Sequence, residues 1–312
     1  MKRWSAACRR VCSGETPGPV DMIPVRIIPR LDIKGPNLVK GIHLEGLRVL
    51  GKPEDFARYY YESGADELIY MDVVASLYGR NSLLDIIERT AREVFIPLLV
   101  GGGLRSLDDI NTALRAGADK VSLNTAAIRR PALVAEAASR FGSSTIVVSV
   151  EAKRRPEGWY EAYTDNGRER TGVNAIEWAS RAVELGAGEI MLTSIEQEGT
   201  GRGFDIDLTR RVSDAVAVPV IASGGAGEMR HIEAVVVDGH ADAVAIAGLL
   251  HYDAMSRLSA ARRDFSSEGN IEYLRSGISH SRLQPVSLVD LKHYLRSREV
   301  DCRPPMAGGS HV

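Results

Sequence analysis

The chain has 312 residues, of which 44% are hydrophobic and 26% are charged, and its formal net charge at pH 7 is −2. These values are typical of an ordinary soluble globular protein and leave room for one large α/β domain or two small ones. They exclude a global basic field that would attract nucleic acid or an anionic membrane. No apolar run approaches the ~20 residues that a membrane span requires.

The three cysteines, Cys8, Cys12 and Cys302, lie in the terminal segments. They offer neither a disulfide framework nor zinc-ligand spacing, which indicates a reducing compartment, and we expect the cytoplasm. The seven histidines also lack metal-ligand spacing, so we expect no metal site and no cofactor.

Residues 1–22 are rich in Arg, Ser, Gly and Pro and show no hydrophobic periodicity. A secretory signal is not indicated, because the segment has basic residues but no apolar core region. We expect a disordered extension, or translation that begins at Met22, and an organelle transit peptide remains an alternative.

From Val25 onward, short apolar runs alternate with longer amphipathic segments, which predicts strands that alternate with helices. The expected strands are 25–31, 67–72, 96–100, 119–123, 145–150, 189–193, 218–222 and 242–246. The expected helices are 53–63, 81–94, 106–116, 131–140, 173–185, 205–216 and 229–238, with Asn81 and Ser106 as two of the caps. Strands that are each followed by a helix favour a parallel sheet. A Rossmann fold is not indicated, because no Gly-x-Gly-x-x-Gly motif follows the first strand.

Two stretches of the chain return as near-copies roughly 120 residues later, a separation far beyond a solenoid period. Residues 62–72 resemble 184–194, and residues 96–103 resemble 218–225. This doubling favours an α/β fold of the (β/α)8 TIM barrel type, with a two-fold internal half-barrel repeat, over an open doubly wound sheet.

The barrel is expected to span residues 23–300. A polar, Ser- and Arg-rich segment at about 254–285 is interpreted as an insertion before a final helix that begins near Ser287. Residues 301–312, which are rich in Pro and Gly, are expected to form a disordered tail.

A glycine turn follows the buried strand in each half, at the barrel end where active sites lie. The first site would combine Gly102 and Gly103 with Asn124 and Thr125, and the second would combine Ser223, Gly224 and Gly225 with Ala247 and Gly248. One glycine pair alone is more often a tight turn. Two pairs at matching positions favour phosphate binding by backbone amides, and hence a substrate with a phosphate at each end.

Asp32 and Glu151 end the first and fifth strands, which lie opposite each other in such a barrel. Two carboxyl groups that face a substrate from opposite sides suit paired general acid and general base catalysis. The alternative is that each carboxylate caps an amide or pairs with Lys34 or Lys153.

Seven segments in order resemble the cyclase subunit of imidazole glycerol phosphate synthase. They are 26–34, 39–41, 66–72, 100–103, 117–127, 186–194 and 222–227, and the likeness runs from about residue 25 to 252 and resumes in the final helix. The resemblance implies an enzyme of histidine biosynthesis that forms a heterodimer with a glutaminase. Ammonia from the glutaminase would cross the barrel and attack the bisphosphate PRFAR, giving imidazole glycerol phosphate and AICAR.

The resemblance also implies roles for individual residues. Asp32 matches a catalytic acid, and Glu151 stands at the position of the second. The further residues implied in substrate or phosphate binding are Lys40, Asp72, Thr193, Glu198 and Gly199, beside the two glycine turns. The implied ammonia gate consists of Arg26, Glu67, Lys120 and Glu189, and Asp119 would face the glutaminase.

Two departures from the family pattern leave other functions open. The family has Asp where this chain has Glu151, and an Asp-x-Asp-Gly-Thr loop where this chain has Glu196-Gln-Glu198-Gly-Thr. Each Glu moves its carboxyl group by one methylene, and a shift of ~1 Å can cost on the order of a hundredfold in rate. One alternative is an ammonia-relay partner of a glutaminase in surface-glycan sugar amidation, with altered or lost cyclase chemistry. Others are a barrel that only activates its glutaminase and the sister isomerase, against which the gate charges and Lys40 argue.

Overall fold

The computed structural model describes residues 23–42, 45–73, 83–261 and 283–305, without the side chains of 42, 45–48 and 259–261. The strands are β1 (Arg26–Lys34), β2 (Asn37–Ile42), β3 (Glu45–Gly51), β4 (Leu68–Asp72), β5 (Leu98–Gly101), β6 (Lys120–Leu123), β7 (Ile146–Arg154), β8 (Tyr160–Thr164), β9 (Glu169–Asn174), β10 (Glu189–Ser194), β11 (Val220–Ser223) and β12 (Ala243–Ile246). The helices are α2 (Pro53–Glu62), α4 (Leu84–Ala91), α5 (Leu107–Ala116), α6 (Thr125–Arg129), α7 (Ala132–Phe141), the 3-10 turn η1 (Ser143–Thr145), α8 (Ala175–Glu184), α9 (Ile206–Ala215), α10 (Met229–Val237), α11 (Gly248–Ala261) and α13 (Leu288–Ser297).

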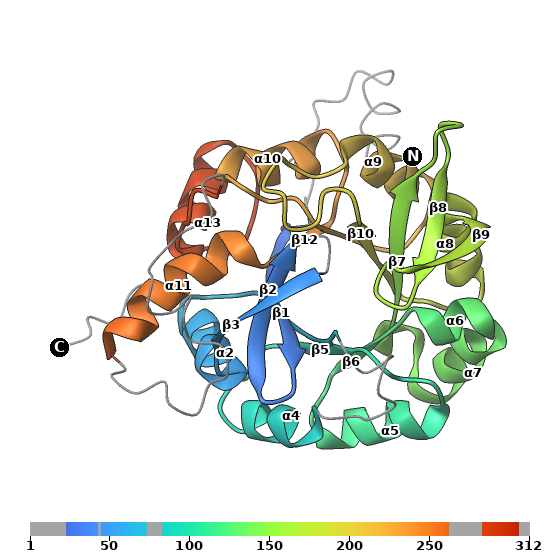
Figure 1. The fold of residues 1–312 in the computed structure, drawn as a ribbon, viewed down its shortest axis with the longest axis horizontal. Coiled ribbons are helices and arrows are strands. Elements are labelled where there is room, and N and C mark those ends of the chain that lie inside the picture. Colours follow the sequence, from blue (N-terminus) through green and yellow to red (C-terminus); the bar gives the residue numbers. More distant parts are fainter. Residues whose placement is uncertain (1–22, 43–44, 74–82, 262–282, 306–312) are drawn as a thin grey trace, which may run out of the picture.

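Eight parallel strands form a closed barrel in the order β1, β4, β5, β6, β7, β10, β11 and β12. β12 pairs with β1, and the pairing of β7 with β10 closes the ring. Helices surround the strands (Figure 1). The prediction of a (β/α)8 barrel is therefore confirmed, while the internal repeat stays an interpretation of the sequence.

The predicted elements agree with the structure, with ends that differ by a few residues. Ser106 caps α5 as expected: its side chain accepts from the backbone N–H of Asp109, and the Asp109 carboxylate accepts from Ser106 N–H. Gly117 ends the same helix with φ 119°, a left-handed conformation that glycine adopts without strain. The predicted cap Asn81 lies outside the described residues.

The barrel interior is built in layers, because alternate residues of each strand point inward. An apolar layer fills the middle and comprises Ile28, Ile69, Leu99, Val147, Met191, Ile221, Ala243 and Ala245. Two larger apolar clusters fill the space between the sheet and the helices. The polar residues discussed below lie at the two ends of the strands, on either side of the apolar layer.

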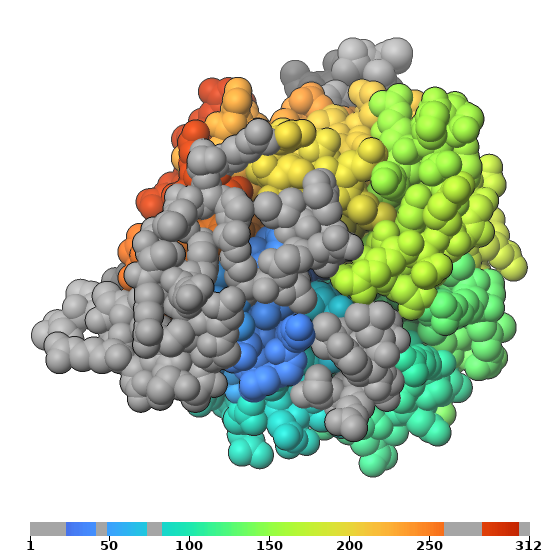
Figure 2. Space-filling view, in the orientation of Figure 1, coloured from blue at the N-terminus to red at the C-terminus, as the bar shows by residue number. Residues whose placement is uncertain are grey.

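Two hairpins that the sequence analysis did not predict extend the strands that carry the candidate acids. β2 pairs antiparallel with the end of β1 and continues into β3, and β8 pairs antiparallel with the end of β7 and continues into β9. In Figure 1, β2 and β3 cross in front of the barrel strands. In the space-filling view, the β8–β9 hairpin in yellow-green stands along one side of the same face (Figure 2).

The C-terminal residues that the structure describes differ from the expected disordered tail. Val25 N–H donates to Asp301 O at 2.8 Å, and Cys302 is buried in a parallel bridge beside Val25. Arg303 forms an ion pair with Asp66 at 3.0 Å. The expectation is thus wrong for 301–305, because pairing with the start of β1 satisfies this backbone. Residues 1–22 and 306–312 lie outside the described residues.

The segment interpreted as an insertion is described only in part. Residues 254–261 continue α11, a helix that the sequence analysis did not predict, and residues 262–282 lie outside the described residues. Among the helices that are described, none is both long and apolar enough to cross a bilayer.

Candidate active site

The two candidate acids lie on opposite strands of the barrel, as the sequence analysis expects. Asp32 is near the carboxyl end of β1 and Glu151 is on β7, four strands away in either direction around the ring. Both side chains are buried, with the residues 3% and 8% exposed. Long strands and hairpins on both sides thus hold the two carboxyl groups across one opening.

Glu151 lies in surroundings that favour its protonated form. Burial raises the pKa of Glu151 to about 7, although the charge of Arg30 and hydrogen bonds from Gly167 and Asn124 lower it. Its buried Oε2 atom and the buried Oδ1 of Asn124 have no hydrogen-bond partner among the described residues. Buried polar atoms without partners are costly, so these two atoms are good candidates for contact with a ligand.

Asp32 contacts a cation that the sequence analysis did not single out. Arg30 Nε donates to Asp32 Oδ1 at 2.9 Å, and Arg30 Nη1 donates to Thr193 Oγ1 at 3.3 Å and Ser223 Oγ at 3.1 Å. Burial opposes the charge of Arg30, but the nearby carboxylates of Asp32 and Glu198 outweigh burial and raise the pKa of Arg30. The available signal was the alternation along β1, which puts Arg30 on the same face as Asp32.

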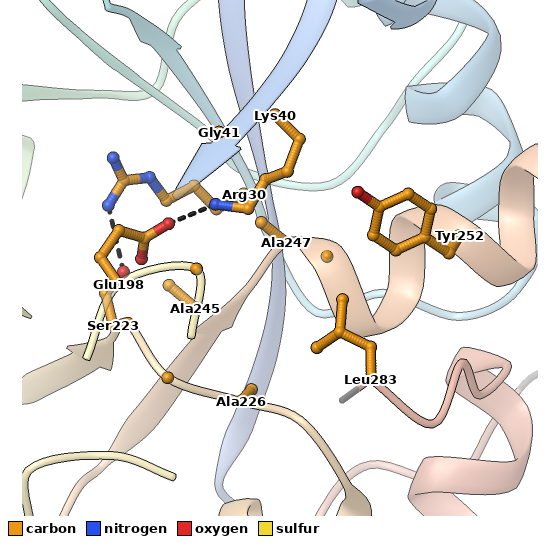
Figure 3. A pocket seen from close by; sticks show the side chains of 14 residues that line it. Arg30, Lys40, Gly41, Glu198, Ser223, Ala226, Ala245, Ala247, Tyr252 and Leu283 are labelled. Carbon is orange, nitrogen blue, oxygen red and sulfur yellow. Dashed lines mark hydrogen bonds and ion pairs between the residues drawn. The ribbon is translucent and has the colours of Figure 1, made fainter. Parts of the chain in front are cut away.

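One cavity gathers the residues of the second predicted phosphate site (Figure 3). Its lining includes Arg30, Lys40, Gly41, Glu198, Gly199, Ser223, Gly224, Gly225, Ala247 and Gly248. Lys40 forms a buried ion pair with Glu198. The first residue of α11 is Gly248, so the positive end of a helix dipole faces the cavity.

The glycines of this cavity allow a close approach of backbone to backbone. Gly225 has φ 109°, and a Cβ atom there would lie 2.0 Å from Gly203 O. Gly224 has φ 92°. Because no other residue fits these positions without strain, glycine lets the turn pack directly against the loop at Gly203.

The first predicted phosphate site lies on the other half of the barrel. Gly102 and Gly103 follow β5 with φ of 96° and 72°, and a Cβ atom on Gly102 would lie 2.3 Å from Asp72 O. Asn124 and Thr125 follow β6, which pairs with β5. The predicted residues thus sit at the carboxyl ends of neighbouring strands.

Four charged residues close a ring at the opposite end of the barrel. Arg26 lies 2.8 Å from Glu67 and 3.2 Å from Glu189, and Lys120 lies 3.1 Å from Glu67 and 2.8 Å from Glu189. Burial raises the pKa of Glu67, whose Oε1 has no hydrogen-bond partner among the described residues. Three strand residues and Glu67, which directly precedes β4, thereby form one ion-pair network across this end of the barrel.

Asp119, the predicted partner-facing residue, is exposed beside this ring. Its carboxylate accepts from the backbone N–H of Leu98 at 2.9 Å, at the start of β5. The described residues contain no group of three or more His, Cys, Asp or Glu side chains that could hold a metal ion.

Comparisons with known proteins all lead to one family. A sequence model of a family described as "Histidine biosynthesis protein" matches residues 26–256. A protein of Legionella pneumophila named "Imidazole glycerol phosphate synthase subunit HisF" is 60% identical over 208 residues, which are 67% of this chain and 98% of the relative. A protein of the same name from Synechococcus sp. (strain CC9311) is 50% identical over 252 residues, which are 80% of this chain and 95% of the relative.

The raised pKa of Glu151 predicts a pH-dependent stability. The folded state holds the Glu151 proton up to a pKa of about 7, whereas the ordinary value is 4.5, so the unfolded state binds fewer protons between these values. The free energy of unfolding therefore falls as pH rises through this window, by on the order of 2 to 3 kcal/mol relative to Glu151→Gln. Urea denaturation at pH 4.5 to 8 measures this difference.

The exposed Glu157 provides the matched control, since Glu157→Gln should leave the pH dependence of the wild type unchanged. A stability difference between wild type and Glu151→Gln that stays constant over the whole pH range would contradict the raised pKa.

Proposed function

We propose that this chain, which belongs to the histidine biosynthesis protein family, is the cyclase subunit of imidazole glycerol phosphate synthase. Its relatives of 50–60% identity carry the name of this subunit and are covered over nearly their whole length. The chain is accordingly a lyase that uses ammonia to convert PRFAR into imidazole glycerol phosphate and AICAR. The observation that carries the proposal is the placement of Asp32 and Glu151 on opposite strands of one opening.

The unequal surroundings of the two acids support different roles. Asp32 accepts a charge-assisted hydrogen bond from Arg30, which suits an ionised carboxylate and a general base. Glu151, with a pKa of about 7, suits a proton donor near neutral pH. Catalytic pairs in which one acid is ionised and the other protonated are a general solution for proton transfer.

These roles fit the bonds that change in the reaction. Ammonia adds to the substrate ketone, and loss of water leaves an imine whose nitrogen then bonds to the formimino carbon. The bond from that carbon to the amine of AICAR breaks, and the amine takes up a proton. Asp32 would accept protons from the incoming nitrogen, and Glu151 would donate to the departing oxygen and amine.

The two glycine turns support the binding of a substrate that carries a phosphate at each end. The backbone amides at Gly102–Gly103 and at Gly224–Gly225 lie on different halves of the opening. Lys40 and Gly248 add a cation and a helix N-terminus to the second turn. Asp32 and Glu151 would then face the middle of the bound molecule.

The amino-terminal face of the barrel supports a partner that supplies ammonia. Ile23 and Phe95, which precede β1 and β5, are 68% and 74% exposed. They precede strands at the end of the barrel that carries the charged ring of Arg26, Glu67, Lys120 and Glu189, which would serve as the ammonia gate. A glutaminase subunit docked here, in a cytoplasmic heterodimer, would release ammonia into the barrel, and exposed Asp119 would face it.

The sugar-amidation alternative is not favoured. Both reported relatives carry the name of the histidine-pathway subunit. The Glu residues at 151 and 198 keep the charge type of the expected acids, and both side chains are buried in the site.

Replacement of Asp32 by Asn removes the proposed base and the negative charge that pairs with Arg30, while an amide oxygen can still accept from Arg30 Nε. We expect ammonium-dependent turnover of PRFAR to fall by roughly 10² to 10⁴-fold, because general base catalysis contributes about that much. Formation of AICAR, followed by absorbance with purified protein, measures the rate. The exposed Asp238→Asn serves as control, and full activity of Asp32→Asn would remove Asp32 from the mechanism.

Replacement of Lys120 by Met opens the charged ring and leaves Glu67 and Glu189 with one cation fewer. We expect the ratio of glutamine-dependent to ammonium-dependent turnover to fall, because only glutamine-derived ammonia has to enter through the ring. Both rates are measured with the assembled heterodimer. An unchanged ratio, with glutaminase binding intact, would argue against a gate at these residues.

A further inference from the structure

Arg30 occupies a place between the apolar layer and the proposed catalytic mouth. It is the next inward residue of β1 after Ile28 and is 3% exposed. From β1 its guanidinium reaches across the interior to the hydroxyl groups of Thr193 on β10 and Ser223 on β11. The small side chains at these positions and at Ala245 leave room for it.

The backbone at Arg30 is fixed from outside the barrel. His251 Nε2 contacts Arg30 O at 2.8 Å, and His251 Nδ1 contacts Tyr60 Oη at 2.6 Å. Burial lowers the pKa of His251 to about 3, so the ring is neutral. Because a carbonyl can only accept, Nε2 carries the proton and Nδ1 accepts from Tyr60. Tyr60 on α2 and His251 on α11 thus fix the backbone of β1 at Arg30.

The guanidinium has donors in excess of its contacts. Of its five N–H groups, those of Nε and Nη1 serve Asp32, Thr193 and Ser223, and Nη2 has no acceptor among the described residues. Arg30 also lines the cavity that contains Gly224, Gly225 and Gly248 (Figure 3). An acceptor that enters this cavity would therefore lie beside the guanidinium of Arg30, on the side where Nη1 donates to Ser223.

The cavity offers two cations and a helix N-terminus to an anion. Arg30 and Lys40 each form an ion pair with one carboxylate, Asp32 and Glu198, so the side-chain charges balance and an anion would depend on the donors that these cations and the backbone present. The N-terminus of α11 adds partial positive charge. A guanidinium fork matches phosphate oxygens in geometry and can bind a second group at the same time, which a lysine ammonium cannot do as well.

We propose that Arg30 binds the substrate phosphate in this cavity through its guanidinium while Nε holds Asp32. One side chain then links occupancy of the phosphate site to the orientation of the catalytic carboxylate. The nature of the phosphate-bearing substrate rests on the proposed function, whereas the anion contact rests on the cavity itself. Arg30 is accordingly a substrate-binding and positioning residue of this site.

The test combines phosphate binding with turnover for Arg30→Met, Arg30→Lys and the exposed control Arg181→Met. Calorimetric titration with inorganic phosphate requires no turnover. We expect Arg30→Met to weaken one class of phosphate site at least about tenfold, as for a lost charge-assisted hydrogen bond, and Arg30→Lys to weaken it less. Arg181→Met should match the wild type.

The kinetic arm uses ammonium-dependent turnover of PRFAR. Arg30→Met should raise KM and lower kcat, because it removes both the phosphate contact and the support of Asp32. Arg30→Lys should recover KM in part but not kcat. Methylguanidinium should partly restore kcat to Arg30→Ala, because it can replace the group that donates to Asp32.

The outcomes separate this inference from the proposed function. Unchanged phosphate affinity in folded Arg30→Met and Arg30→Lys would overturn the phosphate contact, and so would a wild type that binds no phosphate. A loss of kcat with no change in KM would overturn it as well. If the wild type binds phosphate through Arg30 but does not turn over PRFAR, the proposed function fails and the anion contact stands.

Discussion

Closure of the eight-stranded sheet by the pairing of β7 with β10 is the constraint on which the rest of the structure depends. Once the sheet is closed, every second residue of each strand must point into the interior. Along β1 the inward residues are Arg26, Ile28, Arg30 and Asp32. Because the sheet is closed, the inward residues of its strands form three layers: charged residues at the amino-terminal end, apolar residues in the middle and polar residues at the carboxyl-terminal end.

Much of this arrangement could be predicted from the sequence, because it depends on local patterns. Apolar runs with helical segments between them predicted the strands and the barrel, and the capping residue Ser106 predicted the start of α5. The positions of Asp32 and Glu151 followed from their places at the ends of two strands. The four ring residues followed from the family resemblance, and their mutual distances of 2.8 to 3.2 Å agree with a closed ring.

Other features could not be predicted, because they depend on contacts between distant parts of the chain. The 301–305 segment is rich in proline and reads as a tail, yet its backbone pairs with the start of β1. The β2–β3 and β8–β9 hairpins extend strands whose apolar pattern had already ended. In the sequence, Arg30 is a charged residue that interrupts an apolar strand. Its contacts with the hydroxyl groups of Thr193 and Ser223, which are far away in the chain, appear only in the structure.

The same closure places two glycine turns and two acids around one opening, and the account depends on their acting on one molecule. A crystal structure of the inactive Asp32→Asn variant with bound PRFAR tests this most directly. The account predicts one phosphate at Gly102–Gly103, the other at Gly224–Gly225 near Arg30, and Glu151 beside the reacting carbons. A ligand held at only one end, or a Glu151 carboxyl that faces away from it, would contradict the account.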